Sequence, residues 1–230
     1  MQRVGALLVV AAALVLAAGA SAGNGEPRRA ITKADEGRAK AVLVTRADLG
    51  AGFTPVKRER ADLPDDPRCD ALDESDLTIT GDAESPDYTL ESPSAFITVG
   101  STAQVYRTVR EANTSWARGT GSKAAACLAA LVRASAGPGQ KVKVVSSKVV
   151  PFTRVAAKTV AFRLIAKLAV GSTTATVYFD AILLQQGRVQ AGLVLTSVGR
   201  PVPKAEAAAL AAVVASRLAK VSGVKSGPSA

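Results

Sequence analysis

The sequence predicts an α+β fold: an antiparallel β-sheet of five to six strands packed against helices, with one disulfide. Three strand-like runs carry this prediction, TVAFRLIAKLAV, TTATVYFDAILL and RVQAGLVLTSV, and only the short turns at 171–173 and 185–187 separate them. Successive strands joined by such short turns pair as an antiparallel meander. The last run, up to Val221, repeats apolar residues at helical spacing, so one apolar stripe can cover the sheet.

The elements before this meander follow in chain order. Thr32 with Asp35 three positions later is typical of a helix N-terminus, and it predicts a helix from Lys33 to about residue 45. Residues 58–93 are acidic, punctuated by proline and without apolar periodicity, so we expect a long loop there. The remaining expected elements are a strand over 94–108, a helix from a capping box at 108–111 to about residue 118, a helix over 123–134 and a strand at KVKVVSSKVV.

The first residues predict export. Arg3 precedes an apolar run, and the small residues Ala20 and Ala22 then fit a signal-peptidase site with cleavage before Gly23. The alternative is a retained membrane anchor, but the apolar run of about 15 residues is shorter than the roughly 20 that span a bilayer. We therefore expect a secreted, extracytoplasmic protein without a transmembrane segment in its mature form.

The predicted signal peptide is the first segment of the domain organisation that we expect. We expect a signal peptide over 1–22, a disordered leader over 23–31, and a single α+β domain over 32–221 that includes the acidic loop 58–93. A disordered tail over 222–230 completes the chain, and no internal repeat is present.

The two cysteines, Cys69 and Cys127, predict a disulfide, because an even count in an exported chain favours pairing. The alternative is two separate thiols. The bridge would close a loop of nearly 60 residues, which chain-entropy reasoning values at about 4 kcal/mol. Two cysteines without a histidine cannot fill a tetrahedral zinc site, so we expect no metal.

Charge is distributed unevenly along the chain, whose formal net charge is +10. Residues 62–95 carry one cation and eleven anions, net −10, whereas residues 96–230 carry eighteen cations and three anions, net +15. We call residues 62–91 the acidic arm, and we expect it to lie along the basic body near Cys127. The alternative is a solvated loop held only at Cys69.

The chain lacks the residues of common catalytic sites. It contains no histidine, which excludes Ser-His-Asp and Cys-His catalysis, and it has no phosphate-binding or dinucleotide-binding glycine motif. We therefore expect no catalytic residue and no cofactor. Asp180, alone in an apolar strand, suggests a buried ion pair with Arg163 on a neighbouring strand, although a carboxylate-dependent hydrolase is the alternative.

Nucleic acid is not an expected partner despite the isoelectric point near 9.9. The cations are spread over strands and helices, and aromatic residues make up only 4% of the chain, so stacking platforms are scarce.

The layout of the chain resembles a known family. The phrases LVTRADLGAGFTP and AFITVGSTAQVYRT, a QQGR turn and a final helix ending SRLAKV resemble actinobacterial secreted proteins and lipoproteins related to the extracellular sensor domain of serine/threonine kinases. The resemblance covers residues 33–221 and implies a twisted antiparallel sheet with flanking helices around a cleft, ligand binding and no catalysis. The chain lacks a lipobox, a kinase domain and a second cysteine pair, and no binding residue carries over.

Three functions remain in competition. The first is a secreted, monomeric, non-catalytic binding protein of the cell envelope that takes a small apolar or anionic ligand, or an anionic envelope component, in a cleft. The second is the carboxylate-dependent hydrolase, and the third is a structural or adhesive envelope protein that acts through a basic surface. An apolar-lined cleft would favour the first function. Two converging carboxylates in a cleft would favour the second, and a featureless surface with one dense basic patch would favour the third.

Overall fold

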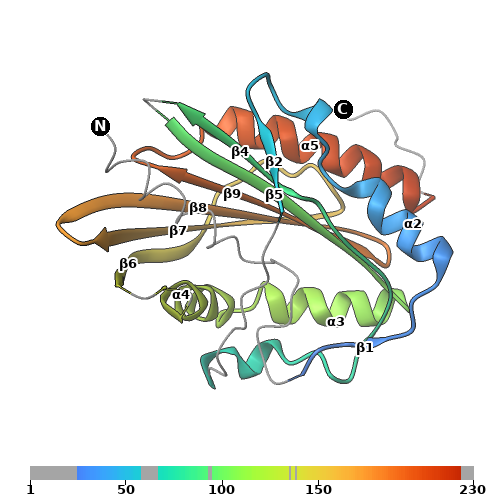
Figure 1. Cartoon of the computed structure of the whole chain (residues 1–230). Coiled ribbons are helices and arrows are strands. Elements are labelled where there is room, and N and C mark those ends of the chain that lie inside the picture. Colours follow the sequence, from blue (N-terminus) through green and yellow to red (C-terminus); the bar gives the residue numbers. More distant parts are fainter. Residues whose placement is uncertain (1–24, 58–66, 93–94, 135, 138, 224–230) are drawn as a thin grey trace.

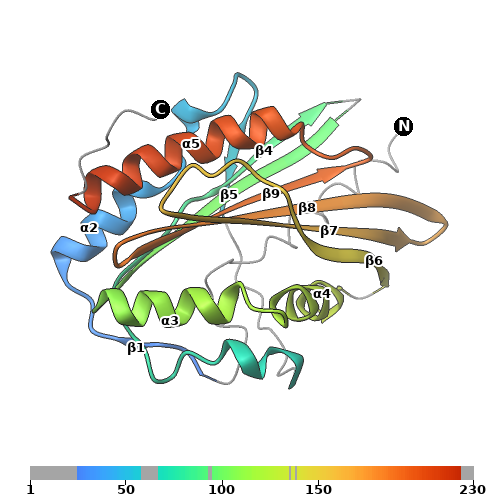
Figure 2. The same cartoon turned by 180° about the vertical axis from the view of Figure 1, so that it is seen from behind.

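The computed structural model describes residues 25–57, 67–92, 95–134, 136–137 and 139–223, and one curved sheet lies between two layers of helices (Figures 1 and 2). Helices α2 and α5 cover one face, and α3 and α4 cover the other. The elements are β1 (Arg28–Arg29), α2 (Lys33–Val42), η1 (Arg46–Asp48), β2 (Thr54–Val56), η2 (Pro67–Leu72), β3 (Thr78–Glu84), β4 (Asp87–Ser92), β5 (Ala95–Tyr106), α3 (Val109–Gly119), α4 (Ala124–Ala134), β6 (Gln140–Val150), β7 (Lys158–Val170), β8 (Thr173–Gln186), β9 (Val189–Val198) and α5 (Lys204–Val221).

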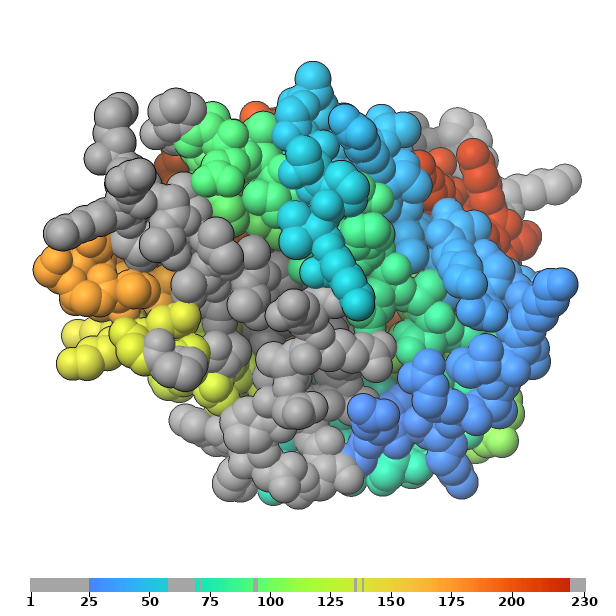
Figure 3. All heavy atoms as spheres, in the orientation of Figure 1, coloured from blue at the N-terminus to red at the C-terminus, as the bar shows by residue number. Residues whose placement is uncertain are grey.

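The sheet has nine strands, more than the five to six that the sequence predicted. Its order is β1-β3-β5-β9-β8-β7-β6, with β4 also paired to β5 and β2 paired to β4. The predicted meander is confirmed, because β6 to β9 pair with their neighbours in antiparallel order. The pairing of β1 with β3 is parallel, so the sheet is mixed and not purely antiparallel. In Figure 3 the segment around β2 lies across β4 and β5 at the surface.

The extra strands come from segments that were expected to be irregular. The prediction of a long loop over 58–93 is wrong for its described part, where β3 and β4 both pair antiparallel with β5. Pro86 lies between these two strands and interrupts neither of them. The disordered leader predicted over 23–31 is also wrong where it is described, because β1 pairs with Thr78 and Ile79.

The face under α2 and α5 holds the larger hydrophobic core. It joins both helices to β5, β8 and β9, and it includes Val42, Leu193 and Leu218, each 0% exposed. Burying one such side chain stabilises the fold by about 1.5–3 kcal/mol. The predicted apolar stripe of the last helix is thereby confirmed as the cover of the sheet.

The face under α3 and α4 has smaller clusters, one of them built around the disulfide. Cys69 and Cys127 are bonded, with their Cα atoms 4.9 Å apart, and both are 0% exposed. They pack with Leu131 of α4 and with Leu164 and Phe179 of the sheet. The predicted disulfide is confirmed, and it joins the acidic arm to α4.

Both predicted helix N-termini are confirmed. The hydroxyl of Thr32 accepts a hydrogen bond from the Asp35 backbone N–H at 3.2 Å, and Thr108 and Glu111 form a reciprocal capping box. Such caps satisfy backbone N–H groups that lack a partner within the helix.

Among the helices of the described residues, none is both long and apolar enough to cross a membrane. The predicted signal peptide with Ala20, Ala22 and Gly23 lies outside the described residues, as do 224–230 of the predicted tail.

Candidate functional site

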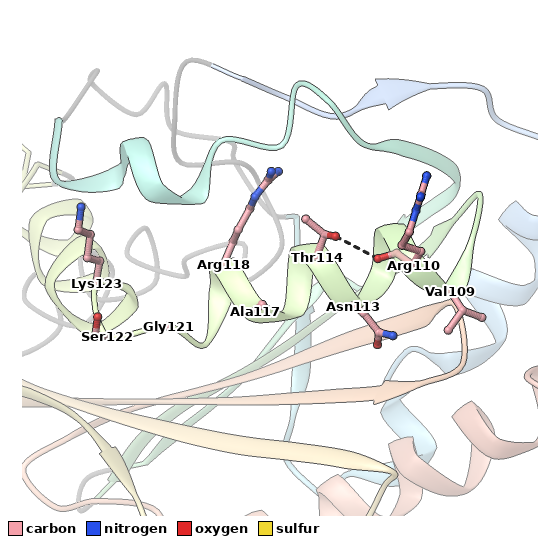
Figure 4. A pocket seen from close by; sticks show the side chains of 9 residues that line it. All are labelled: Val109, Arg110, Asn113, Thr114, Ala117, Arg118, Gly121, Ser122 and Lys123. Carbon is pink, nitrogen blue, oxygen red and sulfur yellow. Dashed lines mark hydrogen bonds between the residues drawn. The ribbon is translucent and has the colours of Figure 1, made fainter.

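An open groove of about 840 Å³ runs along α3 and over the turn that leads to α4 (Figure 4). Cationic, polar and small apolar side chains line it: Val109, Arg110, Asn113, Thr114, Ala117, Arg118, Gly121, Ser122 and Lys123. No lining residue is acidic.

The groove exists because two short helices follow one another with almost no linker. The capping box at Thr108 starts α3, and at its end the Thr120 N–H donates to the Trp116 carbonyl at 2.9 Å. Gly121 then lets the chain turn tightly, because a Cβ there would lie 3.0 Å from the Ala117 carbonyl oxygen. The Ala124 N–H donates to the Gly121 carbonyl at 3.0 Å as α4 begins.

Three cations define the chemistry of the groove. Arg110, Arg118 and Lys123 extend to the same side of the helices, toward the acidic arm (Figure 4). The Thr114 hydroxyl lies between the two arginines and donates to the Arg110 carbonyl at 3.1 Å. Neither Arg110 nor Lys123 forms an ion pair with any residue that the structure describes. The groove therefore presents positive charge that its own lining does not neutralise.

Arg118 is held by the acidic arm. Its guanidinium donates to both carboxylate oxygens of Asp76, at 2.6 and 2.9 Å, and to the Asp73 carbonyl oxygen at 2.6 Å. Hydrogen bonding to Arg118 lowers the pKa of Asp76, and the same bonds raise the pKa of Arg118. Residues 73–76 of the arm thus contact the basic body at Arg118, a groove-lining residue, whereas the arm from Thr78 on belongs to the sheet as β3 and β4.

Beneath this contact, the arm buries a carboxyl group. Glu74 is 9% exposed, and the Tyr106 hydroxyl lies 3.1 Å from its Oε2 atom and 2.7 Å from the Ser115 hydroxyl. Burial raises the pKa of Glu74, and burial together with the charge of Glu74 raises the pKa of Tyr106 well above its usual value. The arm therefore places an ionisable group in a buried position against β5 and α3.

The sheet side of the groove is already occupied by contacts. Asn113 Oδ1 accepts from Lys158 Nζ at 2.6 Å and from Gln185 Nε2 at 2.9 Å. Lys158 Nζ also lies 5.7 Å from the centroid of the Trp116 ring, a cation–π distance. Trp116 thus has a partner within the protein, and Asn113 anchors α3 to the sheet.

The predicted pair of Asp180 and Arg163 forms, but away from the groove. The two residues face each other on β8 and β7, and Arg163 donates to both carboxylate oxygens at 2.6 and 2.9 Å. The hydrogen bond to Asp180 raises the pKa of Arg163. Asp180 is 5% exposed and lies on the sheet face that α5 covers in part. Among the described residues, no cluster of three or more acidic or cysteine side chains could hold a metal.

Sequence reasoning missed a second buried carboxylate. Asp35 accepts from Arg188 at 2.7 and 2.8 Å, from Thr80 at 2.6 Å, and from Arg38. Burial alone would raise the pKa of Asp35, but these donors hold it well below its usual range. The cluster joins α2, β3 and the β8–β9 turn, so its role is structural. Only the position of Asp35 at a helix start gave a signal in the sequence.

The comparisons with known proteins identify no family for this chain. No protein-family model matches the chain, and no curated protein matches it. Among solved structures it is similar to the extracellular domain of PknH from Mycobacterium tuberculosis, with 10% identity and a TM-score of 0.43, over 82% of this chain and 96% of that chain. At this identity and TM-score, the match assigns no residue, family or activity to this chain.

Proposed function

We propose that this chain is an exported, non-catalytic binding protein of the cell envelope, and that the groove along α3 binds an anionic ligand. The observation that carries the proposal is the bidentate contact between Arg118 and Asp76, since it pairs a carboxylate with a groove-lining guanidinium in the geometry that an anionic ligand would need. A guanidinium donates paired hydrogen bonds to carboxylate and phosphate oxygens in this same arrangement.

The contact is weak enough to be exchanged for a ligand. The Asp76 side chain is 61% exposed and the Arg118 side chain 27% exposed. Ion pairs at exposed sites contribute about 0–1 kcal/mol, so an external anion can replace Asp76 at little cost. Arg110 and Lys123 lie along the same groove without an ion-pair partner among the described residues, and they add attraction for the ligand.

The chemistry of the site supports binding in preference to catalysis. No side chain that lines the groove is a carboxylate, thiol or histidine, so among the usual general bases the lining offers only the amine of Lys123. Asp180, on which the hydrolase alternative depends, pairs with Arg163 on strands that do not line the groove. The disulfide between Cys69 and Cys127 supports an oxidising, extracytoplasmic location.

The test compares two variants with the same loss of charge. One replaces the groove cations, Arg110→Gln, Arg118→Gln and Lys123→Gln, and the control replaces three exposed lysines of β6, Lys141→Gln, Lys143→Gln and Lys148→Gln. Binding of fluorescently labelled long-chain polyphosphate is measured by anisotropy at about 0.1 M salt, where non-specific attraction is partly screened.

We expect the groove variant to lose most of its affinity and the β6 variant to lose much less. Equal losses would show that bulk charge alone drives binding and would refute the groove. A larger loss in the β6 variant would instead support an adhesive protein that acts through the basic edge of the sheet.

A further inference from the structure

We infer that the groove takes a linear polyanion, a chain that repeats single negative charges, and not one small anion. The inference rests on the proposed function and names the class of ligand. Its basis is the arrangement of the groove cations, which lie in a row along α3 and do not converge on one point (Figure 4).

The spacing of the row exceeds the size of a small anion. Arg110 and Arg118 are eight positions apart in α3, which corresponds to about 12 Å along the helix axis. Arg118 is fixed toward the arm by hydrogen bonds to Asp73 and Asp76, and Arg110 extends to the same side two turns away. In this arrangement the two guanidinium groups extend side by side and do not converge (Figure 4), so a chain of anions can contact each where it lies, whereas one phosphate or carboxylate would need both side chains to bend toward each other.

A single contact of this kind gives little affinity. An exposed ion pair changes a binding constant by up to about fivefold. When the anions are linked, each contact after the first is intramolecular, and the gain reaches about 10²-fold or more. A polyanion also releases its condensed counterions when it binds a row of cations. The groove therefore discriminates by the length of the ligand.

The middle of the row leaves room for a chain. The positions between the arginines carry the small side chains of Thr114 and Ala117, and the Thr114 hydroxyl is turned back onto the Arg110 carbonyl. A polymer lying along α3 can thus pass from Arg110 to Arg118 without meeting a large side chain on this face.

Two other macromolecular partners fit the groove less well. Trp116, the aromatic residue of α3, already has Lys158 over its ring, so it is no free platform for the bases of a single-stranded nucleic acid. Val109 is the one large apolar side chain in the lining, which is too little apolar surface for insertion into a lipid bilayer. Repeated charge is the feature that the groove offers.

The experiment measures affinity against chain length. Orthophosphate, tripolyphosphate, inositol hexakisphosphate and long-chain polyphosphate are titrated into the full-length exported protein, with single-stranded DNA and anionic vesicles as further probes. Polygalacturonate, which repeats carboxylates, distinguishes a carboxylate polymer from a phosphate polymer, and binding of either supports the inference.

We expect long-chain polyphosphate to bind at least about 10²-fold more tightly than tripolyphosphate. Arg110→Gln should weaken binding of the long chain by up to about fivefold and binding of tripolyphosphate by a smaller factor. Tripolyphosphate or inositol hexakisphosphate binding as tightly as the long chain would overturn the inference while leaving the proposed function intact. Tighter binding of DNA or vesicles would also overturn it. No binding of any anion, or binding that the triple groove variant does not weaken, would overturn the proposed function itself.

Discussion

On the face of the sheet covered by α2 and α5, one large apolar cluster joins both helices to three central strands, and the buried carboxylate of Asp35 is paired there with the partly exposed Arg188. On the face covered by α3 and α4, the apolar clusters are smaller, and a disulfide and the exposed pair of Asp76 and Arg118 hold the acidic arm. The first face is held mainly by one large buried core, and the second is held by smaller buried clusters together with a covalent link and an ion pair that water reaches.

This difference separates stability from ligand exchange. The carboxylate of Asp35 is 7% exposed and has four hydrogen bonds from Arg188, Thr80 and Arg38, so removing one partner leaves a buried charge uncompensated. The carboxylate of Asp76 is 61% exposed, so water or a ligand can replace Arg118 at little cost. We therefore infer that the ion pair of Asp35 on the first face stabilises the fold, whereas the ion pair of Asp76 on the second face can be exchanged for a ligand.

The largest expected effect comes from the disulfide. The double variant Cys69→Ala and Cys127→Ala removes a link across 58 residues and should lower the free energy of unfolding by about 4 kcal/mol. Urea unfolding measures the loss, and limited proteolysis should show faster cleavage in the arm. A loss below about 1 kcal/mol would mean that packing alone holds the arm against α4.

The next largest effect lies on the opposite face. Leu218 in α5 is 0% exposed, and Leu218→Ala should cost about 3 kcal/mol, within the usual range of about 2–5 for a cavity of this kind. Ile31→Ala, at a position 41% exposed, is the control and should change stability by less than about 0.5 kcal/mol. At a temperature where Leu218→Ala stays folded, its polyphosphate affinity should equal that of the wild type. A parallel loss of affinity would contradict the separation of the two faces.

Titration of Glu74 should give a smaller effect. Because burial raises the pKa of Glu74 above its ordinary value of 4.5, its protonated form stabilises the fold fully below that value, and this stabilisation is lost as pH rises toward the folded-state pKa. Arg118 opposes the shift, Asp76 adds to it, and the Tyr106 hydroxyl faces the group.

Glu74→Gln removes this titration. Unfolding free energies of wild type and variant are measured by urea denaturation from about pH 4 upward. As pH rises from about 4 toward the folded-state pKa of Glu74, the free energy of unfolding of the variant should increase relative to that of the wild type by at most about 1.4 kcal/mol per pH unit. If the free energy of unfolding depends on pH in the same way for wild type and variant, the pKa of Glu74 is the same in the folded and unfolded states, and its protonation does not stabilise the packing of the arm.

Local sequence patterns predicted the elements whose causes are local. The capping residues Thr32 and Thr108, the tight turns of the β7–β9 meander and the stripe of α5 all lie within a few residues of the structure that they determine. The disulfide was also predictable, because two cysteines allow a single pairing.

The missed elements depend on distant residues. The charges of β3 and β4 suggested a loop, but both strands are paired to β5, and Asp82 of β3 is matched by Arg29 of β1. Gly81 lies so close to the Asp35 carbonyl that a Cβ would fall 2.3 Å from its oxygen. No local sequence pattern predicts a contact between two residues so far apart in the chain. The groove was missed for the same reason, since Arg110 and Arg118 look like ordinary helix-surface cations until the arm is placed beside them.

The smallest expected effect tests the central claim, which is that the Asp76 carboxylate binds Arg118 where an external anion would bind it. Asp76→Asn should strengthen binding of long-chain polyphosphate by about two- to fivefold, because the ligand no longer competes with the arm for Arg118. Glu36→Gln removes one exposed carboxylate from a pair with Lys40 on α2, so it matches the change in charge and should have a smaller effect.

The decisive measurement repeats Asp76→Asn in an Arg118→Gln background, by anisotropy titration with the same labelled polyphosphate. The account predicts that the gain from Asp76→Asn disappears when Arg118 is absent, which gives a coupling energy of up to about 1 kcal/mol between the two residues. An equal gain in both backgrounds, or no gain in either, would contradict the account, because the arm would then act through bulk charge alone or would not act on the groove.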